Sequence, residues 1–221
     1  TPVVDAECPD LGLLCPAGPD PIVWSYTGKP YLLTSDLRIC PSATLQVDAG
    51  VEVRVAATSP KLNIVVEGSL VVNPTAGATT TFTSQATTQQ RGDWVGLVLR
   101  GGGTHSMQNA EVRYAMDALT AFDGVTLSLD GVTLSNNLYG LRVTGSGALT
   151  TVTATGSSFV NNTHYGVDAS NMLGGTVPAL EVSDSSIHGN GTYDYFVGPV
   201  DNPEETTFDA RRNYWGTTAG A

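Results

Sequence analysis

The chain of 221 residues carries 21 acidic and 10 basic side chains, which gives a formal net charge of −11. The basic residues form no stripe that could follow a phosphate backbone, so nucleic-acid binding is excluded. No apolar stretch is long enough to cross a bilayer, so no membrane span is predicted. The acidic surface itself favours solubility outside the cell.

Residues 1–30 are rich in proline and aspartate and are predicted to form an irregular N-terminal cap. The disulfide candidates are Cys8, Cys15 and Cys40, and either Cys8–Cys15, the local pairing, or Cys15–Cys40 would close this cap. Zinc is not favoured, because the cysteines lack Cys-x-x-Cys spacing and no histidine lies near them. A disulfide implies a secreted or cell-surface protein. The sequence begins at Thr1 without an initiator methionine or a signal-like apolar stretch, which suggests a processed or trimmed chain.

Residues 31–216 read as short β-runs separated by Gly, Asn, Asp or Ser, with no window of helical periodicity. Within this region a motif recurs at intervals of 25 and 28 residues, as the positions of Leu134, Phe159 and Ile187 illustrate. Such a period is typical of solenoids. We therefore predict an all-β fold, a single-stranded parallel β-solenoid of eight or nine coils, followed by a C-terminal tail at 217–221.

Stacking of these coils about 4.8 Å apart would bring equivalent side chains into register. Leu134, Phe159 and Ile187 should then form one inward column, with Val112 extending it. A second inward column should contain Leu119, Leu141 and Val167. At a turn, Asn137, Asn162 and Asn190 should stack, so that their amides bridge neighbouring coils and satisfy corner backbone groups.

Several motifs add a family resemblance that covers about residues 31–216. They are Leu45-Gln-Val-Asp-Ala-Gly-Val-Glu-Val, Val66-Glu-Gly-Ser-Leu-Val-Val, Phe82-Thr-Ser, Gly92-Asp-Trp-Val-Gly-Leu and Asp209-Ala-Arg-Arg-Asn-Tyr-Trp-Gly. The chain resembles the right-handed parallel β-helix modules of bacterial extracellular proteins, which are adhesin-like and more distantly similar to polysaccharide lyases and tail-spike hydrolases. The resemblance implies the fold, whereas function has to come from a site.

Arg142 and Asp168 occupy the same place in neighbouring repeats and should lie on one outward column. They would form either part of a sugar-binding or lyase groove or a cross-strand ion pair, and the ion pair is the interpretation we favour.

Tyr139, Tyr165 and Tyr193, together with Tyr195, should cluster near one edge of the later coils. An aromatic row of this kind can stack against sugar rings, although packing at a corner is the commoner role of such residues.

The remaining polar residues suggest no catalytic centre. His105, His164 and His188 each neighbour turn-forming residues and are predicted to be solvated, and Asp130 and Asp184 are predicted to cap corners. No paired-acid motif is visible. No cofactor is predicted, and Ca²⁺ binding has no motif to support it.

We therefore expect a non-enzymatic extracellular structural, adhesive or assembly module that binds polysaccharide or cell-surface proteins. The alternative is a polysaccharide lyase or glycoside hydrolase. Ice binding is a minor alternative, because threonine-rich runs such as Thr79–Thr83 are present but their positions drift between coils. Exposed strand edges at the solenoid ends would allow self-assembly, or the natural chain would continue there.

Overall fold

A computed structural model of the protein describes residues 13–15, 20–145, 147–170, 176–198 and 208–216. The described residues form 23 β-strands and no helix. Every paired strand is parallel to its neighbours, and each strand pairs with the strand three places further along the chain. One coil therefore consists of three strands, one in each of three sheets.

The strands divide as follows. Sheet A contains β1 Leu13–Leu14, β4 Leu37–Ile39, β7 Asn63–Val66, β10 Gly96–Leu99, β13 Asp117–Ala121, β16 Tyr139–Thr144, β19 Tyr165–Ser170 and β22 Tyr193–Val197. Sheet B contains β2 Ile22–Trp24, β5 Thr44–Val47, β8 Ser69–Val72, β11 Thr104–Gln108, β14 Thr126–Asp130, β17 Thr151–Thr155, β20 Ala179–Ser183 and β23 Phe208–Asp209. Sheet C contains β3 Tyr31–Leu33, β6 Glu52–Val55, β9 Thr80–Ser84, β12 Ala110–Arg113, β15 Thr133–Ser135, β18 Ser158–Val160 and β21 Ser186–His188.

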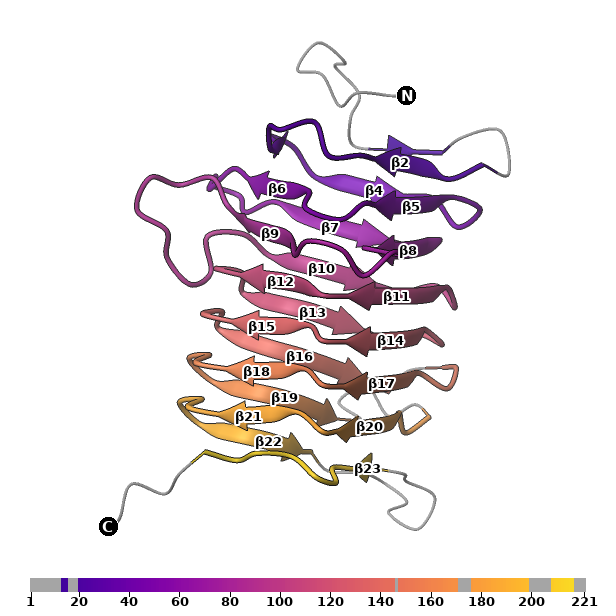
Figure 1. Ribbon diagram of the computed structural model, residues 1–221. Helices are drawn as coiled ribbons and strands as arrows, with labels where there is room; N and C mark the ends of the chain where they lie inside the picture. The colour runs from indigo at the N-terminus through magenta and orange to yellow at the C-terminus, as the bar shows by residue number, and fades with distance from the viewer. Residues whose placement is uncertain (1–12, 16–19, 146, 171–175, 199–207, 217–221) are drawn as a thin grey trace.

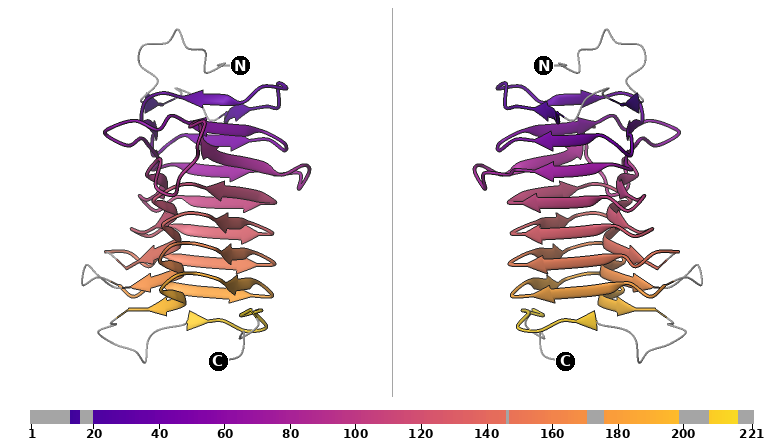
Figure 2. Two further views of the ribbon diagram at one scale, coloured as in Figure 1. Left: turned by 90° about the vertical axis from the view of Figure 1, so that its left-hand side faces the viewer. Right: turned by 90° about the vertical axis from the view of Figure 1, so that its right-hand side faces the viewer.

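The coils stack along one axis, with β2 and β23 at opposite ends (Figure 1). The same stack of strands is seen from both sides of the molecule (Figure 2). The described residues make about seven turns, fewer than the eight or nine coils expected. Coils differ in length because some carry long connections, such as the one between β9 and β10. Strands β1 and β2 already pair with β4 and β5, so regular structure begins inside the segment expected to be an irregular cap.

The predicted inward columns are confirmed. Val112, Leu134, Phe159 and Ile187 are consecutive partners in sheet C, and all four are fully buried. Leu119, Leu141 and Val167 are consecutive partners in sheet A and are also buried. One coil cannot bury these side chains by itself, so the stacking of like on like supplies the hydrophobic core.

The corner between sheets C and A holds the predicted asparagine ladder. Asn162 donates from its backbone and side-chain nitrogens to Oδ1 of Asn190, at 3.0 Å each. Asn137 donates in the same way to Asn162, at 3.0 and 3.2 Å. Asn190 in turn donates from its backbone and side-chain nitrogens to Oδ1 of Asp194, where the ladder ends. These bonds satisfy corner backbone groups that no sheet bond reaches, as the sequence predicted.

A second ladder, at the corner between sheets B and C, was not predicted. The backbone nitrogen of Ser157 donates to Oγ of Ser185, and the backbone nitrogen of Ser185 donates to Oδ1 of Asn213. Asn213 belongs to the Asn-Tyr-Trp-Gly motif, so this motif satisfies the corner of the last coil. The paired serines before Phe159 and Ile187 were the sequence signal for this ladder.

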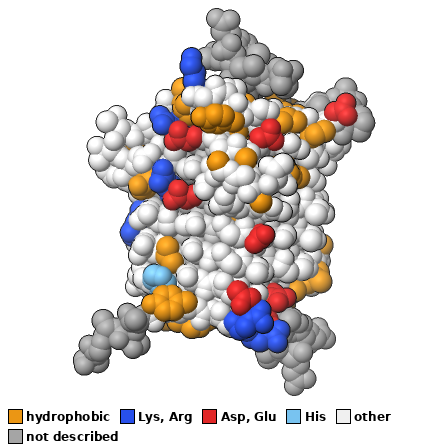
Figure 3. Space-filling model, in the orientation of Figure 1, with side chains coloured by type: hydrophobic (Ala, Val, Ile, Leu, Met, Phe, Trp, Pro, Cys, Tyr) orange, Lys and Arg blue, Asp and Glu red, His pale blue; other side chains and the backbone are white. Residues whose placement is uncertain are grey.

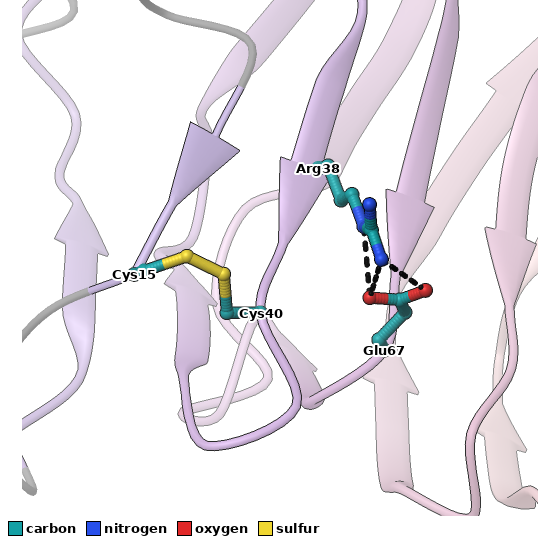
Figure 4. Close-up of a disulfide and its surroundings, with 4 residues drawn as sticks. All are labelled: Cys15, Arg38, Cys40 and Glu67. Carbon is teal, nitrogen blue, oxygen red and sulfur yellow. Dashed lines mark hydrogen bonds and ion pairs between the residues drawn. A yellow bond between two sulfur atoms is a disulfide. The ribbon is translucent and has the colours of Figure 1, made fainter.

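The disulfide joins Cys15 to Cys40, with their Cα atoms 5.1 Å apart. The local alternative, Cys8–Cys15, is therefore wrong, and Cys8 itself lies outside the described residues. Cys15 follows β1 and Cys40 follows β4, which are paired strands of adjacent coils (Figure 4). The bridge links two neighbouring coils because parallel stacking brings residues one coil apart side by side.

Candidate functional site

The outer face of sheet A carries two outward side chains per strand in its later coils. The first position is occupied by Asp117, Tyr139, Tyr165 and Tyr193 in successive strands, and the second by Thr120, Arg142, Asp168 and Phe196. In each strand, the two residues between these outward positions face the interior. In β16, for example, they are Gly140 and Leu141, which are both buried. We call the C-terminal part of this face, made by Tyr139, His164, Tyr165, Tyr193 and Phe196, the aromatic strip.

The Tyr-Gly dipeptides that begin two of these strands have a packing reason. A Cβ at Gly140 would lie 2.3 Å from the backbone oxygen of Gly166, and one at Gly166 would lie 2.5 Å from Nδ2 of Asn190. Only glycine allows the backbone to approach the next coil and the asparagine ladder this closely. The ladder and the tyrosines are therefore positioned by the same corner.

Arg142 forms ion pairs with two carboxylates from the coils on either side. Its Nε lies 3.2 Å from Oδ2 of Asp168, and its Nη1 lies 3.2 Å from Oδ1 of Asp117. Its guanidinium also lies 4.6 Å from the ring centroid of Tyr139. The predicted pairing of Arg142 with Asp168 is present, and Asp117 is a partner that the sequence reasoning missed. We call Asp117, Arg142 and Asp168 the ion triad.

Burial governs the electrostatics of this triad. The side chain of Asp168 is only 4% exposed, and its Oδ1 has no hydrogen-bond partner among the described residues. Burial raises the pKa of Asp168, while the neighbouring Arg142 guanidinium acts in the opposite direction. Burial likewise raises the pKa of Asp117 against the pull of Arg142. Burial disfavours the charged form of Arg142, but the two carboxylates outweigh it and raise the pKa of Arg142.

The predicted tyrosine cluster is contiguous. Ring centroids of Tyr139 and Tyr165 are 5.5 Å apart, and those of Tyr165 and Tyr193 are 5.7 Å apart. Phe196 stacks on both Tyr165 and Tyr193, at 5.1 and 5.4 Å. His164 lies 4.8 Å from Tyr139. Sequence reasoning missed His164 and Phe196, because neither occupies a position that recurs as an aromatic residue.

Tyr195 does not join this strip. It pairs with Val167 in the inward column of sheet A, and burial raises the pKa of its hydroxyl. Its ring instead contacts Trp215 at the C-terminal end.

His105 corrects the expectation that all three histidines are solvated. It is 1% exposed and lies between Leu70 and Leu127 in an inward column of sheet B. Its Nδ1 accepts a hydrogen bond from the backbone nitrogen of Leu70 at 3.2 Å. Burial lowers the pKa of His105 to about 4. The neutral imidazole is therefore part of the core.

The outer face of sheet B carries hydroxyl groups in register. Thr104, Thr126 and Thr151 are consecutive partners, as are Ser106, Ser128 and Thr153. The threonines were expected to drift between coils, and on these three strands they do not. The alignment involves only the outward residues of each strand, so it was not apparent in a sequence that is rich in threonine throughout.

Outside the ion triad, the described residues form six further ion pairs. Glu67 accepts two bonds from Arg38, at 2.8 and 2.9 Å (Figure 4). It also accepts bonds from Arg100, which belongs to a third coil. Asp184, predicted as a corner residue, has a φ of 51° and binds Arg212 at 2.6 Å. On the face drawn in Figure 3, acidic and basic groups lie in small mixed clusters. Among the described residues no three His, Cys, Asp or Glu side chains are arranged to hold a metal ion.

A comparison with protein-family models matches residues 21–124 to a family described as a pectate-lyase like beta helix domain. This match and the three parallel sheets of stacked coils agree on the fold. The chain is a right-handed parallel β-helix module. No curated protein and no solved structure matches the chain significantly.

The module has features typical of extracellular proteins, namely its fold and its disulfide. In the part of the chain that the structure describes, no helix is long and apolar enough to span a bilayer. The aromatic strip lies entirely beyond the matched segment, as do Arg142 and Asp168 of the ion triad, whereas Asp117 lies just inside it. The match itself therefore assigns the strip no role.

Proposed function

We propose that this module is a non-enzymatic, extracellular glycan-binding protein whose binding surface is the aromatic strip. The single observation that carries the proposal is the contiguous set of rings contributed by three successive coils. Aromatic rings on a rigid sheet provide large contact surfaces at low cost in conformational entropy. A repeating surface of this kind suits a repeating ligand, and a polysaccharide is such a ligand.

The ion triad supports binding over cleavage. A lyase needs a base that is free to remove a proton, and a glycosidase needs two carboxyl groups that face each other across a bond. Arg142 is instead held by two carboxylates, of which Asp168 is almost fully buried. These contacts suit a structural role that keeps the strands carrying the aromatic strip in register.

A glycan array probed with labelled protein tests the proposal. Wild-type protein should bind a subset of polysaccharides, and Tyr193→Ala should weaken that binding, because Tyr193 is 52% exposed and offers the most accessible ring. Tyr26→Ala is the matched control, since Tyr26 is 67% exposed in one of the first coils. Equal binding by both variants would remove the strip from consideration.

The enzyme alternative, a polysaccharide lyase or glycoside hydrolase, is tested with the same protein. Incubation with acidic and neutral polysaccharides, followed by detection of new reducing ends and unsaturated products, should show no turnover. Cleavage by the wild-type protein that is lost in Arg142→Met, while circular dichroism shows the variant still folded, would establish the alternative.

Ice binding is a second candidate function, because six outward hydroxyls of sheet B lie in register on three strands. Their spacing, about 4.8 Å between coils and about 6.6 Å along a strand, forms a two-dimensional array that could order water. Thermal hysteresis and ice recrystallisation measurements test this candidate. Thr126→Lys should abolish any effect, whereas Thr81→Lys on sheet C should preserve it.

A further inference from the structure

The tyrosines of the aromatic strip follow the axis of the solenoid. Tyr139, Tyr165 and Tyr193 occupy one register position in three adjacent strands, so the line joining them crosses the strands. Their ring centroids are separated by 5.5 and 5.7 Å. This step is comparable with the length of one pyranose residue in an extended chain. A linear glycan lying along the axis would therefore meet one tyrosine for each sugar.

The three rings are not equivalent. The ring of Tyr139 contacts both the Arg142 guanidinium and the ring of His164, and Tyr139 is half-buried. Tyr165 is stacked on Phe196 and remains half-buried. Tyr193 is the most exposed of the three. The strongest contact with a sugar ring should therefore come from Tyr193.

Charge selects the kind of glycan. The ion triad beside the strip contains two carboxylates and one guanidinium, which leaves an excess of one negative charge. The whole chain also carries a net charge of −11. Arg142 is shared between two carboxylates, so it has little capacity to attract a further anion. A uronic-acid chain would meet repulsion here, whereas an uncharged chain would not.

We propose that the aromatic strip binds a linear, uncharged polysaccharide along the solenoid axis, with one sugar for each of three coils. This inference rests on the proposed function and adds the ligand class, its direction and the number of subsites. A neutral ligand differs from pectate, the acidic polymer after which the matched family is named.

Isothermal titration with neutral oligosaccharides of increasing length tests the inference. The probes are cello-, manno- and xylo-oligosaccharides of one to six sugars, with oligogalacturonates of equal length as acidic comparators. Affinity for one neutral series should rise up to three sugars and then level off. Tyr193→Ala should lower the affinity about tenfold and move the plateau to two sugars, whereas Tyr26→Ala should leave both unchanged.

Two sets of results would overturn the inference, and they are distinguishable. Tighter binding of oligogalacturonates, or affinity that rises steadily beyond three sugars, would refute the neutral three-subsite ligand while preserving glycan binding, provided that Tyr193→Ala still weakens it. Failure of every oligosaccharide to bind, or binding that Tyr193→Ala leaves unaltered, would refute the proposed function as well. Circular dichroism of each variant confirms that the β-structure is retained.

Discussion

The guanidinium of Arg142 donates from Nε to Oδ2 of Asp168, at 3.2 Å, across the boundary between two coils. The same guanidinium reaches Asp117 on the opposite side, so three successive coils are tied together by one side chain. Removal of Arg142 would leave two largely buried carboxylates without a counter-charge, which is costly in a protein interior.

Arg142→Met should therefore lower the free energy of unfolding by about 3 kcal/mol. The double variant Arg142→Met/Asp168→Leu should recover part of this loss, because it removes the more deeply buried carboxylate as well. Urea unfolding followed by circular dichroism measures both. Equal stability of the single and double variants would show that Asp168 is not the group that Arg142 compensates.

Asn162→Ala should destabilise the chain by about 2–4 kcal/mol, because it leaves the backbone nitrogen of Asn137 and the backbone oxygen of Leu134 without their side-chain partners. Asn161→Gly is the matched control. Asn161 has a φ of 55°, a conformation that glycine adopts without strain, so this change should alter stability by only a few tenths of a kcal/mol. A comparison of chemical unfolding midpoints decides the matter, and similar losses in both variants would argue against the ladder.

His105 should make stability depend on pH. Burial lowers its pKa from 6.5 to about 4, so the unfolded chain binds a proton at a higher pH than the folded chain does. The contribution is therefore fully present above pH 6.5 and is lost as the pH falls toward 4. At pH 5 the loss should amount to about 2 kcal/mol.

His105→Leu provides the comparison, because leucine matches the neighbouring residues Leu70 and Leu127 in the same column. This variant should be less stable at neutral pH by about 1–3 kcal/mol, since the Leu70 amide loses its acceptor. Its stability should nevertheless fall less than that of the wild type between pH 7.5 and pH 5. Parallel pH profiles for the two proteins would contradict the assignment.

Reduction of the Cys15–Cys40 bridge should destabilise the first coils. The bridge closes a loop with a sequence separation of 25 residues, for which chain entropy corresponds to about 3.5 kcal/mol. Cys40→Ala should reproduce the effect of a reducing agent, and Cys8→Ala should not. Peptide mapping under non-reducing conditions identifies the linkage directly, and a Cys8–Cys15 peptide would contradict the fold of this end.

The periodic features of the fold could be predicted from the sequence. Leu134, Phe159 and Ile187 recur at equivalent positions, and parallel stacking makes equivalent positions into neighbours. The same logic predicted the asparagine ladder, the pairing of Arg142 with Asp168 and the tyrosine row. Each of these depends on register alone, which a repeat sequence records.

Features that depart from the repeat were harder to foresee. The residues next to His105 along the chain suggested a turn. Its position is nevertheless an inward one, at which the following coils place leucine and valine. His164 and Phe196 join the aromatic strip because neighbouring coils bring them against Tyr139 and Tyr165. Spacing likewise did not decide between the two possible partners of Cys15, because a local and a coil-to-coil bridge are both compatible with the chain.

By itself, then, the sequence determined the architecture of this protein: its strands, its period, its inward columns and the polar residues that satisfy one of its corners. Only the tertiary structure decided which outward side chains share a surface, which carboxylates meet Arg142 and which histidine is buried. The physical reason is that register follows from a repeated pattern of apolar residues, whereas contacts between non-equivalent side chains depend on how each coil bends and on the lengths of its connections.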